Sequence, residues 1–306
     1  MKREEVKIKF DDEISLFGNK FYNDEKEIKG IVQLVHGMAE HISRYDQFCE
    51  FLVKEGFMVL SFDLYAHGKT CGDPEKVGVV EKYDFMDTMI KSVKTVREYF
   101  DEEYNKYSIN CLFGHSMGSM ISQYYVELYP EDFNYLILSG PEIGRSLYKM
   151  AKVLTKLFMK KDEIVYSDFI HNISLGGFNK KFKNDHPTVG WLSRNDENRR
   201  SYELDPYCGK MYPVNYFYSL SVLLLNSIKK ENLSKINKNL KVFVFSGIED
   251  PVTRFGENVP LLKKRFDGLG INVITKIYDN ARHEVLNESD EIKKLVYNDI
   301  IIFLNS

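Results

Sequence analysis

The chain has 306 residues, of which 43% are hydrophobic and 28% are charged. This composition is ordinary for a globular protein with a sizeable core, and it excludes a disordered chain, a collagen repeat and a disulfide-rich scaffold. The formal net charge is −3, so no overall basic field favours binding to nucleic acid. The four cysteines form no C-x-x-C pair, which argues against a thiolate zinc site.

The N-terminal sequence MKREEVKIKF has acidic residues where a signal peptide would have its apolar stretch. The longest apolar runs, residues 222–225 and 300–304, are far shorter than a membrane span. We therefore expect a soluble, cytoplasmic protein.

Strands alternate with amphipathic helices through most of the chain. The apolar patterns predict strands at residues 6–10, 16–22, 30–35, 57–62, 109–113, 135–138, 242–245 and 273–278. Helical spacing predicts helices near residues 45–52, 85–104, 117–128, 259–266 and 292–304. The first two strands form an antiparallel hairpin, and the later alternation predicts a mostly parallel eight-stranded sheet with helices on both faces.

Residues 141–240 interrupt this rhythm with helical patterns at residues 147–158 and 217–228 and with polar loops. We interpret them as an inserted, largely helical cap, and residues 1–140 and 241–306 as the core. The cap has 17 Lys and Arg against 10 Asp and Glu, a net of +7, which leaves the core at −10. This asymmetry indicates either cap-to-core attraction and a solvated face, or a cap that transiently contacts a membrane surface of anionic lipid.

The strongest motif is a G-x-S-x-G sequence, Gly114-His115-Ser116-Met117-Gly118. It lies between a predicted strand and a predicted helix, the context of a nucleophile elbow. The two glycines allow a turn so tight that larger residues would clash, and the turn lifts the Ser116 hydroxyl above the sheet. We expect the His115 side chain to point away from that hydroxyl.

A serine nucleophile needs a base, and the base needs an orienting acid. In the elbow fold these follow in the order Ser, Asp or Glu, His, each in a loop after a strand. Asp250 follows the strand after the cap, and His283 follows the last strand. Glu249 is the nearest rival for the acid, and Asp279 is a weaker one.

An oxyanion hole needs two backbone N–H groups that point to one place. Met117, directly after the nucleophile, supplies one. The loop after the third strand begins with His36 and Gly37, and the glycine permits close approach of the backbone. Met38 is the candidate for the second donor.

With these blocks in place, the chain resembles an α/β-hydrolase of the monoacylglycerol lipase and bacterial lysophospholipase group, also classed with serine aminopeptidase S33-like hydrolases. The resemblance rests on HGMAEHISRY (residues 36–45), GHSMGS, the G-x-x-D of residues 247–250, ARHEVLNE (residues 281–288) and the cap segment LSRNDENRRSYELDPYCG (residues 192–209). It implies an α/β-hydrolase fold, a Ser116/Asp250/His283 triad, oxyanion donors at Met38 and Met117, and a lipid-like ester as substrate.

Two departures from the group's pattern concern the shape of loops. Residues 63–68 read D-L-Y-A-H-G where the group usually has D-x-R-G-H-G, and Asn280 stands where glycine is common. Neither position supplies a nucleophile or a proton, so we expect substrate fit, and not catalysis, to be affected.

The favoured function is that of a serine esterase or lipase whose apolar cap helices accommodate an acyl chain. Acyl transfer, aminopeptidase-like cleavage on the same triad, and a non-catalytic binding scaffold remain open alternatives. No phosphate loop, dinucleotide fingerprint or H-E-x-x-H motif occurs, so we expect no cofactor and no metal. The expected partner is a small ester or lipid and not nucleic acid.

Overall fold

The structure is a computed structural model, and it describes residues 1–80, 85–160 and 163–306. One sheet of eight strands runs through the molecule in the order β1-β2-β4-β3-β5-β6-β7-β8. The β1–β2 and β2–β4 pairs are antiparallel and all others are parallel. The strands are β1 Lys2–Lys9, β2 Ser15–Tyr22, β3 Gly30–Val35, β4 Phe57–Phe62, β5 Ile109–His115, β6 Tyr135–Ser139, β7 Lys241–Gly247 and β8 Val273–Tyr278.

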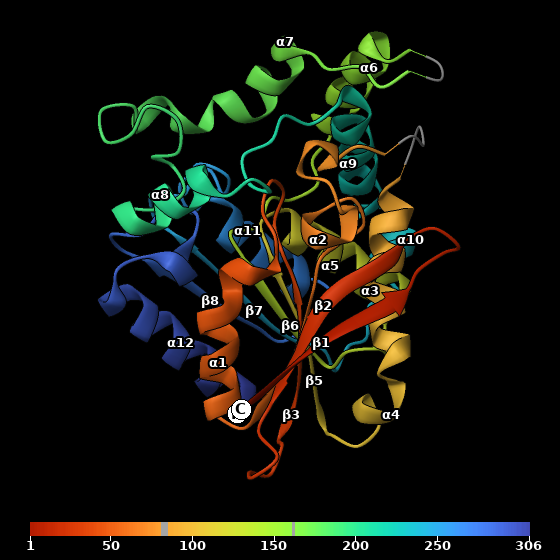
Figure 1. Cartoon of the computed structure of the whole chain (residues 1–306), viewed down its shortest axis with the longest axis vertical. Coiled ribbons are helices and arrows are strands. Elements are labelled where there is room, and N and C mark those ends of the chain that lie inside the picture. Colours follow the sequence, from red (N-terminus) through yellow and green to blue (C-terminus); the bar gives the residue numbers. More distant parts are fainter. Residues whose placement is uncertain (81–84, 161–162) are drawn as a thin grey trace.

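Helices cover both faces of this sheet (Figure 1). Buried side chains of α1 and α12 pack on one face, and those of α3, α5 and α11 pack on the other. The core helices are α1 Asp46–Lys54, α2 Gly68–Cys71, α3 Met86–Tyr99, α4 Asp101–Tyr104, α5 Met117–Leu128, α11 Asn258–Asp267 and α12 Asp290–Leu304. Short 3-10 helices lie at Ile42–Tyr45, Pro74–Lys76 and Val285–Asn287.

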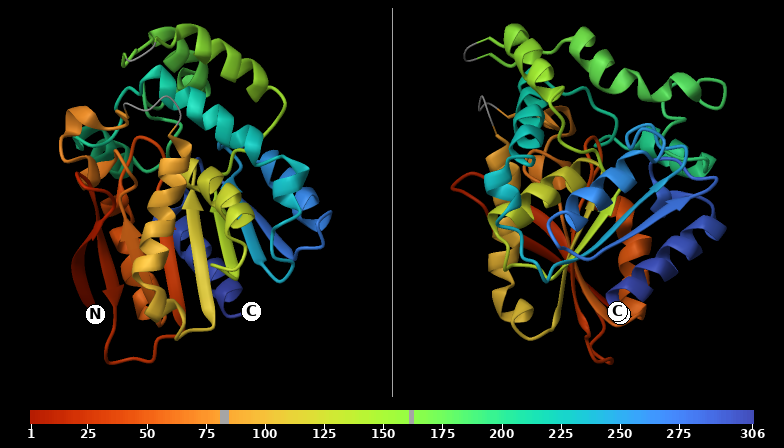
Figure 2. Two further views of the ribbon diagram at one scale, coloured as in Figure 1. Left: turned by 90° about the vertical axis from the view of Figure 1, so that its right-hand side faces the viewer. Right: turned by 180° about the vertical axis from the view of Figure 1, so that it is seen from behind.

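Most of the described chain between β6 and β7 lies above the carboxyl ends of the parallel strands (Figure 2). Helix α9 packs against α5 and α3 of the core, and α6 packs on α9. The cap contains α6 Tyr148–Phe158, α7 Asp168–His171, a π-helix Asn172–Gly176, a 3-10 helix Phe178–Lys181, α8 Asp196–Leu204, α9 Val214–Asn226 and α10 Lys230–Leu233.

The expected fold class is confirmed: the sheet is mostly parallel, eight-stranded and covered on both faces. Three strands, β3, β4 and β8, have the predicted bounds. β3 and β4 are mostly apolar, with one polar residue each, Gln33 and Ser61, and both are buried at every residue. Within the described ranges no helix has both the length and the apolar character needed to cross a membrane.

Candidate active site

Ser116 lies at the sharp turn between β5 and α5. Its backbone has φ +53° and ψ −119°, a conformation that a non-glycine residue rarely adopts. The turn is tight, because a Cβ on Gly114 would lie 2.5 Å from the carbonyl oxygen of Gly118. A Cβ on Gly118 would lie 2.1 Å from the carbonyl oxygen of Val35. The two glycines of the motif are therefore required by the geometry of the turn.

His283 and Asp250 are joined by a buried hydrogen bond. The Nδ1 atom of His283 lies 3.0 Å from Oδ2 of Asp250, and the side chains are 2% and 0% exposed. The second oxygen of Asp250 accepts the N–H of Val252 at 2.8 Å, which fixes the carboxylate. Burial alone would lower the pKa of His283, but the Asp250 charge and hydrogen bond outweigh it and raise this pKa above its usual value.

Glu249 and Asp279, the two rivals for the acid, lie elsewhere. The Glu249 carboxylate pairs with Arg194 and Arg282, and these arginines keep its pKa below the usual value although burial opposes them. Asp279 is exposed at the start of the loop after β8. Of the three carboxylates, Asp250 is the one bonded to His283.

Ser116 and His283 line the same cavity. Among the described residues, the Ser116 hydroxyl and the Nε2 atom of His283 have no hydrogen-bond partner in the protein, and no direct bond joins them. The Ser116 hydroxyl and the Nε2 atom of His283 are therefore both available to form hydrogen bonds with a ligand. His115 was expected to point away from the hydroxyl; it bonds Ser139 Oγ at 3.0 Å, while its ring packs 4.7 Å from that of His283.

The loop after β3 carries Gly37 and Met38 against the serine. A Cβ on Gly37 would lie 2.6 Å from Oε1 of Glu40 and 3.1 Å from Cβ of Ser116, so a side chain at this position would force the neighbouring groups to shift. Within the described residues, the N–H groups of Met38 and Met117 donate to no protein acceptor. Both amides belong to residues that line the cavity, so they are available to a ligand oxygen there.

His36 fixes the direction of the Met38 amide. Its Nε2 atom accepts the N–H of Leu64 at 3.0 Å, so its Nδ1 carries the proton and donates to the carbonyl of Gly37 at 2.7 Å. Since a trans peptide is planar, the Met38 N–H points opposite to that carbonyl. Burial lowers the pKa of His36 to about 3, so the ring stays neutral.

A hydrogen-bond network around Arg44 joins the loop after β3 to the loop that carries His283. Its guanidinium bonds Glu40 at 2.9 Å and both oxygens of Glu284 at 2.6 Å. The Glu40 carboxylate also accepts the N–H of Gly37 at 2.7 Å. Glu40 and Arg44 both belong to the HGMAEHISRY motif, and their place in that motif is the only sequence signal of this role.

The cavity measures about 360 Å³ and lies between the core and the cap. The apolar residues of the helical pattern at 147–158 lie on two sides of α6. Leu154 lines the cavity, as does Leu147 before the helix, which is 46% exposed, whereas Met150, Val153 and Leu157 are exposed to solvent. Further apolar lining includes Met120, Ile173, Leu175, Phe178, Trp191, Leu192, Phe217, Leu220, Leu224 and Val252.

In the described part of the chain, one group of side chains has the spacing of metal ligands: His41, Asp205 and Cys208, whose ligand atoms lie within 4.8 Å of one another. The His41 and Asp205 side chains bond each other at 2.7 Å, and burial raises the pKa of the Cys208 thiol, which disfavours the thiolate form that binds metal. The group's evident role is to join the cap to the loop after β3.

Asn280 has φ +55°, the left-handed region in which glycine is favoured and asparagine is tolerated. The departure from the group's glycine therefore keeps the backbone conformation of that loop.

Comparison with known proteins places the chain in a family. The model of the serine aminopeptidase S33 family matches residues 26–290. The chain is 24% identical to a monoglyceride lipase homolog of Monkeypox virus, over 89% of this chain and 88% of that protein. It is 23% identical to a probable lysophospholipase L2 of Haemophilus influenzae, over 92% and 85% of the two chains. It is 26% identical to monoglyceride lipase of Rattus norvegicus, over 89% and 81%.

A solved structure with the same fold is a thermostable carboxyl esterase from Bacillus coagulans in complex with glycerol. Its TM-score is 0.89 and its identity 25%, and the match covers 100% of this chain and 98% of that one. The fold and the serine elbow define a serine hydrolase of the esterase and lipase type. More particularly, the chain belongs to the serine aminopeptidase S33 family of α/β-hydrolases.

Proposed function

We propose that the protein hydrolyses carboxylic esters of lipid-like molecules, of the monoacylglycerol or lysophospholipid type, through an acyl-enzyme on Ser116. The observation that carries the proposal is the His283–Asp250 pair beside the strained serine, at one apolar cavity. The lipase and lysophospholipase names of the relatives support the substrate class.

In this reaction the Ser116 hydroxyl attacks the ester carbonyl while Nε2 of His283 takes its proton. His283 then gives that proton to the leaving alcohol, and Asp250 stabilises the imidazolium in between. Water, deprotonated by His283, attacks the acyl-enzyme and releases the acid. The charge on the carbonyl oxygen is stabilised by the N–H groups of Met38 and Met117.

The proposal includes the division of the chain into a core, residues 1–140 and 241–306, and a cap, residues 141–240. The cap supplies α6 and α9, whose apolar side chains line much of the cavity. A cavity of this volume with mostly apolar walls suits an acyl chain.

Aminopeptidase action is less well supported, because it needs an unpaired carboxylate for the substrate's ammonium group. The carboxylates that line the cavity belong to Glu40, Glu142 and Glu284. Each has an arginine nitrogen within 4 Å: Arg44 for the first and third, at 2.9 and 2.6 Å, and Arg145 for Glu142, at 3.7 Å. Arg145 pairs with Glu142, and Arg44 is shared by Glu40 and Glu284, so none of the three carboxylates lacks a cationic partner.

The proposal also includes contact with an anionic membrane surface through α6. Met150, Val153 and Leu157 are 77%, 61% and 76% exposed and share one side of the helix. Lys149 and Lys156 flank them. An exposed apolar stripe beside lysines is typical of a helix that lies on anionic lipid.

The test is a panel of monoacylglycerols, lysophospholipids, short p-nitrophenyl esters and aminoacyl anilides, assayed with wild type and Ser116→Ala without added metal. We expect hydrolysis of esters that Ser116→Ala abolishes, with preference for substrates that carry an acyl chain. Turnover by Ser116→Ala would remove the mechanism. Preference for anilides would favour the aminopeptidase alternative, and transfer to an added alcohol in place of water would favour an acyltransferase. No turnover of any substrate would favour the binding scaffold.

A further inference from the structure

Ala39, the residue after the Met38 amide, is held by the cap at both of its backbone polar groups. Its N–H donates to the hydroxyl of Tyr212 at 2.8 Å, and its carbonyl accepts the N–H of Gly209 at 3.0 Å. Ala39 has φ +59°, which is strained for a residue with a side chain. Such strain, about 1–3 kcal/mol, persists only where the surroundings hold the backbone in place.

The same loop is joined to the cap at two further points. Nε2 of His41 lies 2.7 Å from the Asp205 carboxylate, and Arg44 donates to the Asn198 side chain at 2.8 Å. These bonds and those of Ala39 all reach cap residues 198–212.

The histidine loop binds the same region. The N–H of Glu284, next to His283, donates to the carbonyl of Leu192 at 2.7 Å. The Arg282 side chain donates to the carbonyl of Gly190 at 2.6 Å. Cap residues 190–212, here called the clamp segment, therefore hold both loops of the site.

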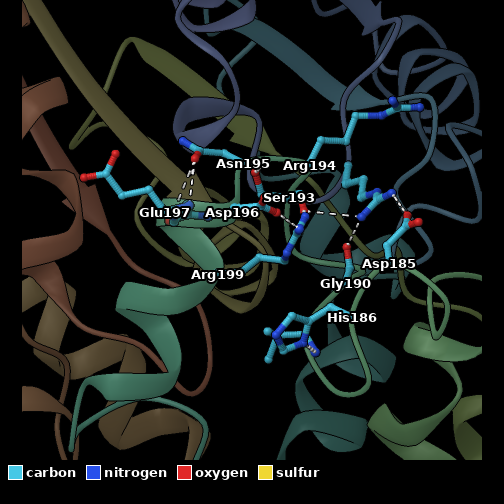
Figure 3. Close-up of polar contacts among 12 residues, drawn as sticks. Asp185, His186, Gly190, Ser193, Arg194, Asn195, Asp196, Glu197 and Arg199 are labelled. Atoms are coloured by element: carbon cyan, nitrogen blue, oxygen red, sulfur yellow. Dashed lines mark hydrogen bonds and ion pairs between the residues drawn. The ribbon is translucent and has the colours of Figure 1, made fainter.

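The clamp segment is itself well fixed. Arg199 of α8 donates to the carbonyl of Ser193 at 2.6 Å, and the Asn195 side chain caps the start of α8 (Figure 3). The Tyr212 ring packs edge-on against Tyr216, with 4.3 Å between centroids. Its other side meets Gly78, where a Cβ would lie 2.3 Å from the ring. The Tyr212 hydroxyl is thus held in one position.

We propose that Tyr212 is a positioning residue for the ester hydrolysis, whose hydroxyl holds Ala39 and thereby aims the Met38 amide at the oxyanion. This inference rests on the proposed function. An oxyanion donor must lie close to the oxygen as it becomes charged, so a small displacement of the donor weakens its stabilisation of the transition state. Substrate binding in the ground state depends on the apolar cavity, which Tyr212 does not line.

The test compares Tyr212→Phe with Tyr104→Phe. The Tyr104 hydroxyl donates to Gln33 at 2.7 Å, and both tyrosines are 1% exposed, so each variant loses one buried hydroxyl bond. We expect similar losses of thermal stability. In Tyr212→Phe kcat should fall roughly 10- to 100-fold, less than the loss of a whole oxyanion donor, while KM stays within about twofold. In Tyr104→Phe both kcat and KM should be unchanged.

A second readout separates positioning from general loosening. An alkyl trifluoromethyl ketone forms a hemiketal with Ser116, whose oxyanion occupies the hole, whereas an alkyl alcohol of equal chain length only fills the cavity. Tyr212→Phe should lose affinity for the ketone in proportion to its loss of kcat/KM and keep its affinity for the alcohol. A kcat within twofold of the control variant, or equal losses for ketone and alcohol, would overturn the proposal.

Failure of the proposed function would look different. The ketone would then fail to inhibit the wild type, or would inhibit Ser116→Ala equally well. If Tyr212→Phe does not fold, Asp205→Asn weakens the neighbouring link to His41 and leaves Tyr212 in place. It should show the same pattern to a smaller degree, and unchanged kcat and ketone affinity in that variant would contradict a positioning role of the cap.

Discussion

Arg44 presents two guanidinium nitrogens to the two carboxylate oxygens of Glu284, each at 2.6 Å. Arg44 follows the loop of the candidate oxyanion donor, and Glu284 follows His283. One buried ion pair therefore joins the loop of the proposed base to the loop of the proposed oxyanion donor. The Arg44 charge holds the pKa of Glu284 at about 2 against the opposing effect of burial, so the carboxylate stays ionised.

Replacing Arg44 by methionine should destabilise the protein strongly. It leaves two buried carboxylates, Glu40 and Glu284, without a cation, which typically costs about 3–5 kcal/mol. The control is Lys263→Met, which removes an exposed pair with Asp267, for which about 0–1 kcal/mol is expected. Urea unfolding measures both. Equal shifts of the two midpoints would contradict a structural role of the Arg44 network.

Asp250→Asn should lower kcat by a large factor, on the order of 10⁴ as in other triads, because the imidazole loses its orienting carboxylate. Glu249→Gln is the matched variant at the neighbouring position. Its carboxylate pairs with arginines, and we expect nearly wild-type kcat from it. Steady-state kinetics on a p-nitrophenyl ester decide; if the two variants exchange these effects, Glu249 is the acid.

The pH dependence of kcat/KM should follow His283. The base must be neutral, and Asp250 raises its pKa, so the rate should rise with pH through an inflection above 6.5. His36 and His115, with pKa values lowered by burial to about 3 and 4, do not titrate there. The contribution of the His283–Asp250 pair to the free energy of unfolding has the opposite pH dependence. It is fully present below pH 6.5 and is lost as the pH rises through the raised pKa of His283. Rates from pH 5 to 9 check this, and an inflection below 6.5 would contradict it.

Removing the exposed apolar stripe of α6 should weaken membrane contact without harming the site. In Met150→Ser/Leu157→Ser we expect less binding to vesicles of anionic lipid and unchanged turnover of a short soluble ester. The control is Leu204→Ser, 74% exposed on α8. Sedimentation with vesicles at two salt concentrations measures binding, which should also fall with salt. Equal vesicle binding by wild type, Leu204→Ser and the double variant would contradict membrane contact through α6. The basic charge of the cap would then be explained as a solvated face.

Much of the fold could be predicted because its signals are local. The segments that form β3 and β4 are mostly apolar, and the elbow's glycines have a steric reason that can be recognised from sequence. The choice between Glu249 and Asp250 could not be made locally, since both follow β7. It depends on Arg194 and Arg282, which come from distant segments and pair with Glu249.

The features that could not be predicted from sequence depend on contacts between residues far apart in the chain. The bond from Ala39 to Tyr212 joins residues 173 positions apart, and Tyr212 belongs to no motif with a chemical signature. Helix α6 was interpreted from its apolar residues as one face, but apolar side chains lie on two sides of it. Periodicity finds such a helix but does not tell which side meets the cavity and which meets solvent.

The most direct measurement is the site of acylation. Protein incubated with a fluorophosphonate, or quenched in acid during turnover of a p-nitrophenyl ester, can be digested and its modified peptide sequenced by mass spectrometry. We predict one adduct per chain, on Ser116, absent from Ser116→Ala and much slower to form in His283→Ala. Ester turnover with no adduct on Ser116, or with the adduct on another residue, would contradict the account.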